Sequence, residues 1–259
     1  MTQSFRDYEL IIVNDGSTDN SLMIMGKYEE SDDRVHVFNK KNEGVNIARK
    51  TGVEYAKGEW ILFIDSDDEL TENSIAAMYS YARNDVDMIV GSLMDYSFFR
   101  KTRYNLYSYE EKNYLQYTRD LIRNKIHKGP FARLIRKSLF DSSTFDMPLI
   151  ITIAEDYIMN LRLGQKCRKI ILIPDIVYRY IHRPESAISK RRYNRDYERI
   201  LMHTLCLSIL PENKKLVKTV IIWQKWWEIK LIIKSLIIWI KKILKNNVIG
   251  NEQGIEQIL

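Results

Sequence analysis

The stretch that decides the fold is residues 60–68, Trp-Ile-Leu-Phe-Ile-Asp-Ser-Asp-Asp (WILFIDSDD). The continuous apolar run at 60–64 predicts a buried strand. Carboxylates follow at its carboxyl end, at Asp65, Asp67 and Asp68. In sheets flanked by helices, ligands bind beyond the carboxyl ends of the strands. The stretch therefore predicts an α/β sheet with a ligand site at this edge.

The three carboxylates at this strand end suggest a cation. Neighbouring carboxylates repel one another, and a hard divalent ion with oxygen ligands relieves that repulsion. Mg²⁺ or Mn²⁺ bridging a phosphate fits this chemistry best. The alternative is a solvated acidic loop that caps the helix expected from Thr71, and the residues alone leave both interpretations open.

The first ninety residues alternate short apolar runs with helical stretches. Such alternation predicts a parallel sheet with helices on both faces. We expect the strands at 8–14, 35–38, 60–64 and 87–90, and the helices at 19–30, 46–56 and 71–83. Further along, we expect helices at 110–126, 153–163 and 193–207 and a strand at 169–173.

Two more acidic sites stand out. The strand at 8–14 ends in a turn that runs from Asn14 to Asp19, and turn and helix-capping preferences explain most of its residues. They do not require Asp15, which could accept a hydrogen bond from a base or a ribose. The pair Glu155-Asp156 lies in an apolar segment, where one carboxylate could point into a cleft as a general base.

Composition and charge exclude several classes of protein. The chain has 259 residues, with 45% hydrophobic and 29% charged residues, which is typical of an ordinary globular protein. Two cysteines, Cys167 and Cys206, cannot form a disulfide scaffold and favour a reducing compartment. The first residues lack the pattern of a secretory signal. We therefore expect the protein to stay inside the cell.

The basic charge is concentrated in one segment. Residues 213–245 hold nine lysines and one acidic residue, Glu228, while the whole chain carries a net charge of +6. The rest of the chain is therefore slightly acidic, unlike a uniformly basic nucleic-acid binder. We expect no nucleic-acid partner.

The segment 213–245 also has an amphipathic pattern. Its uncharged runs are too short to span a bilayer. Lysines 230, 234, 241 and 245 share one stripe of a helix, and isoleucine, leucine and tryptophan cover most of the rest. A basic helix that carries tryptophan suits an anionic membrane surface. The alternative is a helix packed on its own domain or on a partner chain.

Three stretches together resemble a known family. They are VNDGSTDNS at 13–21, NEGVNIARKTGVEYAKGEWILFIDSDDEL at 42–70 and AEDYIMNLRL at 154–163. In this order and spacing they resemble glycosyltransferase family 2, whose members have the GT-A fold, a Rossmann-like α/β domain. The resemblance implies an inverting transferase that uses a nucleotide-diphosphate sugar, most often a UDP-sugar, with Mn²⁺ or Mg²⁺.

The resemblance also assigns roles to residues. On the donor side, Asp15 matches the acid that contacts the nucleotide base, and Arg49 matches a basic residue near the nucleotide. Asp65 and Asp67 match the D-x-D pair, with Asp65 nearer the ribose and Asp67 on the metal. Lys50 departs from the family's usual asparagine after Ala48-Arg49.

For the chemical step, Asp156 matches the family's general base and Glu155 precedes it. A carboxylate there would deprotonate the acceptor hydroxyl for a single in-line displacement. The resemblance further implies a polysaccharide or lipid-linked glycan acceptor, as in exopolysaccharide or cell-envelope synthesis. We therefore expect a cytoplasmic enzyme, peripheral on the inner face of the cell membrane.

The expected organisation is a GT-A domain at 1–190 followed by a helical, basic, amphipathic tail at 191–259. Residues 1–90 would form the nucleotide-binding half and 91–190 the acceptor half. The family begins with a strand and a helix ahead of a segment like residues 3–7. Since this chain starts on that segment, we expect an N-terminally truncated domain with an incomplete donor site and an exposed sheet edge.

Three other classes of protein share features of this sequence. A haloacid-dehalogenase-type phosphotransferase also has a strand ending in D-x-D, but it needs Thr or Val where this chain has Glu69. A P-loop NTPase needs a GxxxxGK[ST] motif, which the sequence lacks. The third is an inactive transferase fragment that only binds a partner or a membrane, and it stays open.

Overall fold

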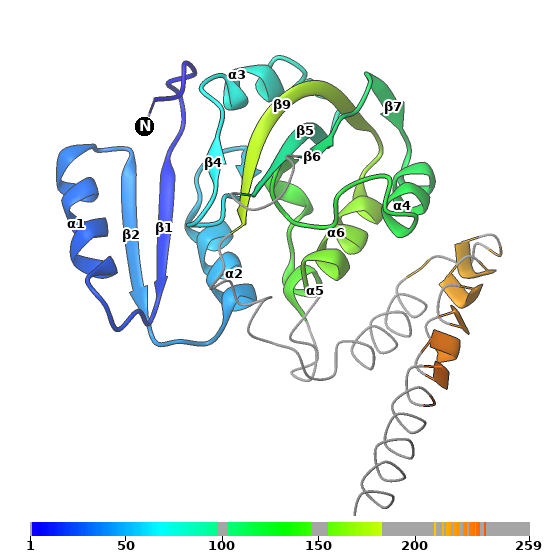
Figure 1. Cartoon of the computed structure of the whole chain (residues 1–259). Helices are drawn as coiled ribbons and strands as arrows, with labels where there is room; N and C mark the ends of the chain where they lie inside the picture. The colour runs from blue at the N-terminus through cyan, green and yellow to red at the C-terminus, as the bar shows by residue number, and fades with distance from the viewer. Residues whose placement is uncertain are drawn as a thin grey trace, which may run out of the picture. The chain divides into compact units, whose positions relative to one another are not determined.

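The computed structural model describes residues 2–97, 103–146, 155–182, 210 and a set of helical positions between 214 and 236. The chain divides into two compact units, residues 1–191 and 192–259. Within the described residues, all strands belong to the first unit. That unit is an α/β domain, as the sequence predicts (Figure 1).

The elements of the first unit have the following bounds. The strands are β1 (Leu10–Asp15), β2 (Val35–Lys40), β3 (Trp60–Leu62), β4 (Glu69–Leu70), β5 (Met88–Ser97), β6 (Arg103–Asn105), β7 (Glu110–Lys112), β8 (Arg133–Arg136) and β9 (Ile170–His182). The helices are α1 (Ser21–Ser31), α2 (Val45–Tyr55), α3 (Ser74–Tyr79), α4 (Tyr114–Ile122), the 3₁₀ helix η1 (Lys137–Leu139), α5 (Ser142–Phe145) and α6 (Glu155–Lys166).

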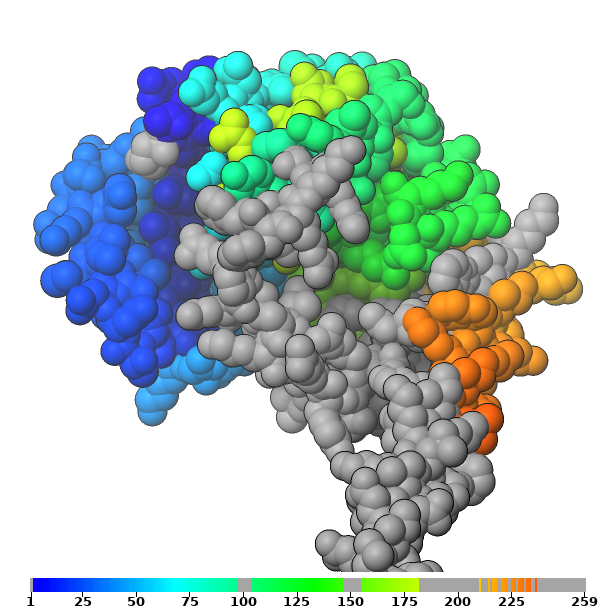
Figure 2. All heavy atoms as spheres, viewed as in Figure 1, coloured from blue at the N-terminus to red at the C-terminus, as the bar shows by residue number. Residues whose placement is uncertain are grey.

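The first strands form a small parallel pair. β1 and β2 pair in register from Leu10 with Val35 to Asp15 with Lys40. Helix α2 packs on β1, and α1 packs mainly on β2. Figure 2 shows this part of the unit, in blue, on one flank of the domain, with the segment around α4, in green, on the other. The predicted strands at 8–14 and 35–38 and the predicted helices at 19–30 and 46–56 are confirmed.

The larger sheet is mixed, which corrects the prediction of a parallel sheet. Its seven strands run in the order β3-β8-β5-β9-β4, with β6 beside β5 and β7 beside β9. β5 and β9 are parallel, but β8 runs antiparallel to both β3 and β5, and β4 runs antiparallel to β9. The sequence pattern of each strand is local and cannot show that β8 returns between β3 and β5 in the opposite direction.

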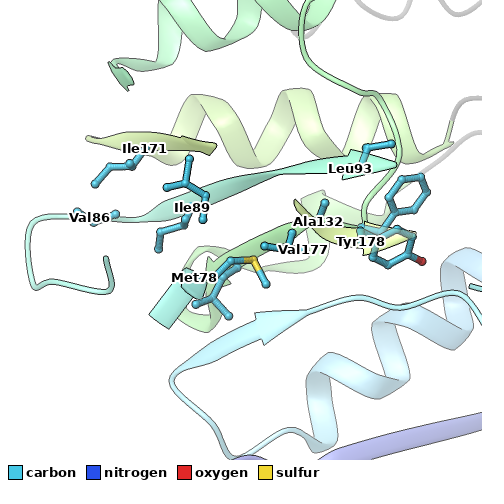
Figure 3. Close-up of a cluster of buried hydrophobic side chains, with 11 residues drawn as sticks. Met78, Val86, Ile89, Leu93, Ala132, Ile171, Val177 and Tyr178 are labelled. Atoms are coloured by element: carbon cyan, nitrogen blue, oxygen red, sulfur yellow. The ribbon is translucent and has the colours of Figure 1, made fainter. Parts of the chain in front are cut away.

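The core lies on β5 and β9. Met78 of α3 packs with Ile89 of β5, Val177 of β9 and the ring of Tyr178, and all four are fully buried. Figure 3 shows Val86 at one end of this cluster and Tyr178 at the other. The core therefore fixes the position of the Tyr178 ring, which becomes important at the site.

One predicted helix is partly wrong. The expected helix at 110–126 starts with the strand β7, which pairs with the edge of β9 through Glu110 and Leu172. Helix α4 begins only after Asn113, whose side chain forms a capping box with Gln116. Pairing with β9 overrides the local helical pattern at these positions. The expected helix at 193–207 lies outside the described residues.

A large cavity separates the two sheets of the first unit. Among the described residues β1 pairs only with β2, and β3 pairs only with β8. The facing edges of β1 and β3 leave a cavity of about 1490 Å³, lined by residues such as Leu10, Trp60 and Leu62. The two acid-bearing strand ends therefore belong to separate hydrogen-bonded sheets, whereas the sequence predicts one.

Candidate functional site

The carboxylates after β3 lie on a tight turn. The Asp68 N–H donates to the Asp65 carbonyl oxygen at 3.1 Å, which closes the turn over Asp65–Asp68. Asp65 and Asp67 remain partly exposed, whereas Asp68 is buried. The structure thus leaves Asp65 and Asp67 accessible to a ligand and directs Asp68 toward the domain interior.

Asp68 has its own partners, which modifies the argument from charge repulsion. Its carboxylate accepts a hydrogen bond of 2.8 Å from the Tyr178 hydroxyl and another of 2.8 Å from the Ile181 N–H. Burial raises the pKa of Asp68 to about 6, although these two hydrogen bonds oppose the shift. Part of the repulsion among the three acids is therefore relieved without a cation.

Arg49 joins two of the predicted site residues. It lies on α2 with a side chain only 10% exposed. One guanidinium nitrogen donates to Asp65 at 3.1 Å, and the other donates to Asp156. Burial lowers the pKa of Arg49, but the charges of Asp156 and Asp65 outweigh it and raise the pKa above its ordinary value. Arg49 is therefore a permanent cation that bridges two carboxylates from distant parts of the chain.

Asp156 lies in the first turn of α6, next to Glu155. The partial positive charge of a helix N-terminus favours a carboxylate there. Burial nevertheless raises the pKa of Asp156 above its ordinary value, while the charge of Arg49 opposes the shift. A carboxylate with a raised pKa is a better proton acceptor than an exposed aspartate. Glu155 is close enough for its charge to help raise the pKa of Arg49.

A buried network supports the start of α6. Asn160, one turn after Asp156, donates to the carbonyl oxygens of Lys128 and Gly129 at 2.8 and 2.9 Å. The fully buried Arg133 donates to the carbonyl oxygens of residues 127, 129 and 131. The loop at 127–131 is thereby fixed against α6, and the Arg133 charge reaches far enough to lower the pKa of Asp156 slightly.

Asp15 has a different set of contacts. Its carboxylate accepts hydrogen bonds from Lys40, from the Glu43 N–H and from the Gly44 N–H, at 2.8 to 3.0 Å. Burial raises its pKa, but these bonds hold the pKa below its ordinary value. Gly44 is the N-cap of α2, the helix that carries Arg49. The Asp15 carboxylate therefore fixes a different turn from the one at 14–19, namely the turn before α2, and its contact with a nucleotide base remains a prediction.

Whether the site can bind a divalent cation depends on the two accessible carboxylates, Asp65 and Asp67. Within the described part of the chain, no three His, Cys, Asp or Glu side chains converge as a metal site. Asp67 and Asp65 nevertheless offer the carboxylate oxygens that Mg²⁺ and Mn²⁺ prefer. Mg²⁺ is commonly held by one or two carboxylates together with substrate phosphates and water. The residues present therefore fit a cation that arrives with a diphosphate.

The six predicted site residues fall into two groups. Arg49 brings Asp65 and Asp156 together, and Asp67 and Glu155 adjoin these two in the chain. Asp15 directs its hydrogen bonds to residues 40–44 instead, and the cavity between β1 and β3 is lined by none of the six.

The structure adds Tyr178 to the site and gives Asp68, one of the three carboxylates after the predicted strand, a role in holding the turn. The signal available for Tyr178 was weak, because the V-Y-R-Y alternation at 177–180 predicts only which face of a strand each residue occupies.

The comparisons with known proteins find glycosyltransferases among the relatives of this chain. Residues 1–143 match the model of the family described as glycosyl transferase family 2. A putative glycosyltransferase of Bacillus subtilis, EpsH, is 28% identical over 228 residues, covering 83% of this chain and 64% of its own length. A poly(ribitol-phosphate) beta-glucosyltransferase of Bacillus spizizenii is 30% identical over 192 residues, covering 70% of this chain and 28% of its own.

The structural comparison supports the fold. The crystal structure of S. aureus TarS residues 1–349 in complex with UDP-GlcNAc superimposes with a TM-score of 0.67 at 20% identity, covering 85% of this chain and 64% of that one. The chain thus spans less than two thirds of the length of each of these relatives and of the TarS chain. The fold is the GT-A type of this neighbour, and since the family model matches more than half of the sequence, the chain belongs to glycosyl transferase family 2.

Proposed function

We propose that the chain is an inverting glycosyltransferase that moves a sugar from a nucleotide-diphosphate sugar, of the UDP type, to a glycan acceptor. The observation that carries the proposal is the bridge from Arg49 to both Asp65 and Asp156. It connects the D-x-D turn, which suits a donor diphosphate, through one side chain to the partly exposed carboxylate of Asp156, which suits a general base. A single displacement needs these two groups around one sugar carbon.

Each residue of the site has a role in this proposal. Asp65 and Asp67 would hold Mn²⁺ or Mg²⁺, which when bound neutralises charge on the diphosphate leaving group. Asp156 accepts the proton of the acceptor hydroxyl as that oxygen attacks the sugar and the bond to the diphosphate breaks. Arg49 keeps Asp156 ionised until the acceptor arrives. Glu155 adds negative charge beside Arg49.

The donor assignment has independent support. The S. aureus TarS structures that share the fold are complexes with UDP-GlcNAc and with UDP. For Asp15 we propose a contact with the nucleotide base that coexists with its bonds to the turn before α2, since a carboxylate offers about four lone-pair sites. Arg49 would then face the nucleotide from the helix that Asp15 positions.

The acceptor is proposed to be a polysaccharide or a lipid-linked glycan. Relatives include a poly(ribitol-phosphate) beta-glucosyltransferase and a poly(ribitol-phosphate) beta-N-acetylglucosaminyltransferase, TarP, of Staphylococcus aureus. Both names give poly(ribitol-phosphate) as the polymer that receives the sugar. By analogy we place the reaction at the cytoplasmic membrane face, in cell-envelope or exopolysaccharide synthesis.

The second unit supports attachment to an anionic membrane surface. Its described helical positions include a stripe of exposed apolar side chains at helical spacing: Ile222, Trp226, Ile229, Ile233 and Leu236. Lysines flank this stripe, and the ammonium of Lys230 lies over the Trp226 ring at 5.1 Å. No helix among the described residues has the length and hydropathy of a membrane span. Apolar insertion together with attraction to anionic lipids accounts for this composition.

An assay of UDP release tests the proposed reaction. The purified chain is incubated with UDP-GlcNAc or UDP-glucose, Mn²⁺ and a poly(ribitol-phosphate) acceptor. We expect UDP release that depends on the acceptor and the metal and that disappears in Asp67→Ala and Asp156→Asn. Equal UDP release by wild type and by both variants would refute the proposed site.

The open cavity between β1 and β3 favours a second candidate. A donor-side sheet that is interrupted at this point suits a protein that keeps the fold but only binds a partner or a membrane. The two candidates differ in one measurable property. A folded wild-type chain that binds vesicles and does not bind UDP would support the second candidate.

A further inference from the structure

The turn that carries the D-x-D pair is attached to β9 by one tyrosine. The Asp65 N–H donates to the Tyr178 hydroxyl oxygen at 3.1 Å. The same hydroxyl donates to Asp68 at 2.8 Å. Tyr178 thus contacts the turn at both of its ends, through the main chain at residue 65 and through the side chain at residue 68.

The hydroxyl is held in place by the surrounding core. Tyr178 is fully buried, and its ring stacks on Phe131 with centroids 4.5 Å apart and planes 9° apart. It lies on β9 between Leu93 of β5 and Leu70 of β4. Figure 3 shows its hydroxyl at the end of the apolar cluster, directed away from Met78 and Val177. Movement of the hydroxyl would require repacking of this cluster, so its position is rigid.

A second bond from β9 holds the outer end of the turn. The Ile181 N–H donates to the other oxygen of Asp68 at 2.8 Å. The two oxygens of Asp68 are therefore bonded to two successive parts of the same strand. Burial raises the pKa of Tyr178, so its hydroxyl keeps its proton and remains a donor to Asp68.

This arrangement separates the carboxylates of the D-S-D-D sequence by task. Asp68 anchors the turn, and Asp65 and Asp67 stay accessible on its other side. Carboxylates bind a cation and diphosphate well only if they are preorganised, because positions that deviate by about 0.5 Å weaken such a site. The hydrogen bonds from Tyr178 and Ile181 to Asp68 supply that preorganisation, and both come from β9, more than a hundred residues away in the sequence.

We propose that Tyr178 is a positioning residue that sets the Asp65–Asp68 turn for the metal and diphosphate of the donor. The proposal rests on the proposed function, since it deepens the role of the same turn. It predicts that loss of one hydroxyl group loosens the turn before any ligand is added and weakens the metal-dependent part of nucleotide binding.

The first test needs no ligand. Hydrogen–deuterium exchange of the peptide covering residues 61–70 is compared between wild type and Tyr178→Phe. The matched control is Tyr117→Phe, which removes another buried hydroxyl, one that accepts a hydrogen bond from Arg133 at 3.1 Å. We expect faster exchange at 65–68 in Tyr178→Phe and unchanged exchange there in Tyr117→Phe. Unchanged exchange in a folded Tyr178→Phe variant would overturn the proposal.

The second test measures calorimetric UDP affinity with and without Mn²⁺ in the same three proteins. We expect the enhancement by Mn²⁺ to be about tenfold smaller in Tyr178→Phe than in wild type, with metal-free UDP affinity unchanged. Tyr117→Phe keeps the full enhancement. An equal enhancement in Tyr178→Phe would overturn the positioning role, whereas its absence in wild type would overturn the proposed function itself.

A second variant covers the case in which Tyr178→Phe does not fold. Asp68→Asn keeps the side-chain volume but can satisfy only one of its two donors, Tyr178 or Ile181, as before. We expect faster exchange at 65–68 and a reduced enhancement by Mn²⁺. Wild-type values for both in Asp68→Asn would overturn the proposal.

Discussion

Arg49 donates a hydrogen bond to Asp156, which lies 107 positions further along the chain, and a second one to Asp65 at 3.1 Å. This bridge joins the end of β3 to the start of α6 through a residue of α2. It brings together carboxylates from two of the stretches that resemble the family, 42–70 and 154–163.

Replacement of the proposed base tests the chemical step. Asp156→Asn keeps the size of the side chain but removes the proton acceptor. We expect UDP release to fall by about 10²- to 10⁴-fold, the usual contribution of a general base, while UDP affinity changes little. Steady-state kinetics and calorimetry measure the two effects. Asp33→Asn, an exposed aspartate between α1 and β2, is the matched control, and a normal rate in Asp156→Asn would exclude Asp156 as the base.

Loss of Arg49 changes both stability and pH dependence. Arg49→Gln leaves Asp156 and Asp65 without their cation, and we expect unfolding to become easier by about 2 kcal/mol, since both carboxylates are partly exposed. Arg49 lowers the pKa of Asp156, so its removal raises that pKa further.

A base must be ionised to act, so the acid limb of the pH–rate profile is expected to move to higher pH in Arg49→Gln. Arg49→Lys provides the control, because a single ammonium preserves charge but cannot bridge both carboxylates. We expect Arg49→Lys to restore the pH–rate profile of wild type more fully than it restores the free energy of unfolding. If the pH–rate profile does not move in Arg49→Gln, Arg49 does not control the ionisation of Asp156.

His127 gives the fold a measurable acid sensitivity. Burial, together with the charges of Arg133 and Lys128, lowers the pKa of this half-buried histidine from 6.5 to about 4. Its Nδ1 accepts the Gly129 N–H at 2.9 Å, which requires a neutral ring nitrogen. Below pH 6.5, His127 becomes protonated in the unfolded state, whereas in the folded state it stays neutral until the pH approaches about 4.

The contribution of His127 to stability is therefore expected to be full above pH 6.5 and to decline as the pH falls toward 4. Urea unfolding of wild type and His127→Asn across this range measures it. The difference in the free energy of unfolding between the two proteins should shrink with falling pH, because the variant does not titrate. Parallel curves for the two proteins would show that His127 does not stay neutral in the folded state.

Membrane attachment is tested with the exposed stripe of the second unit. We expect Ile229→Ser with Ile233→Ser to reduce co-sedimentation with vesicles that contain phosphatidylglycerol by about tenfold, from the loss of apolar burial. Ile24→Ser, at a 50% exposed position of α1, is the control and should bind as wild type does. Equal binding of the double variant, or equal binding to neutral vesicles, would favour packing of this helix on protein.

The sequence predicts the first half of the domain well, for identifiable reasons. The strands at 35–38 and 60–64 and the helix at 46–56 each carry a local apolar pattern bounded by turn residues, and the structure contains them as β2, β3 and α2. The direction of β8 and the strand β7 depend on pairing with β3, β5 and β9. Local patterns do not contain that information.

The same distinction applies to the site. The D-x-D acids and the Glu155-Asp156 pair are recognisable because their residue types and their place after a strand or in an apolar helix carry the signal. The orientation of Asp68 depends on Tyr178, which lies 110 positions away and has no motif around it. The bonds from Asp15 to the turn before α2 likewise could not be predicted, because Glu43 and Gly44 lie 28 and 29 positions away.

The most direct test of the central claim is calorimetric titration of UDP into the chain, with and without Mn²⁺, beside Asp67→Ala. The account predicts UDP binding that Mn²⁺ strengthens in wild type and that Mn²⁺ leaves unchanged in Asp67→Ala. A folded wild-type chain that does not bind UDP, or an Asp67→Ala variant with the full effect of Mn²⁺, would contradict it.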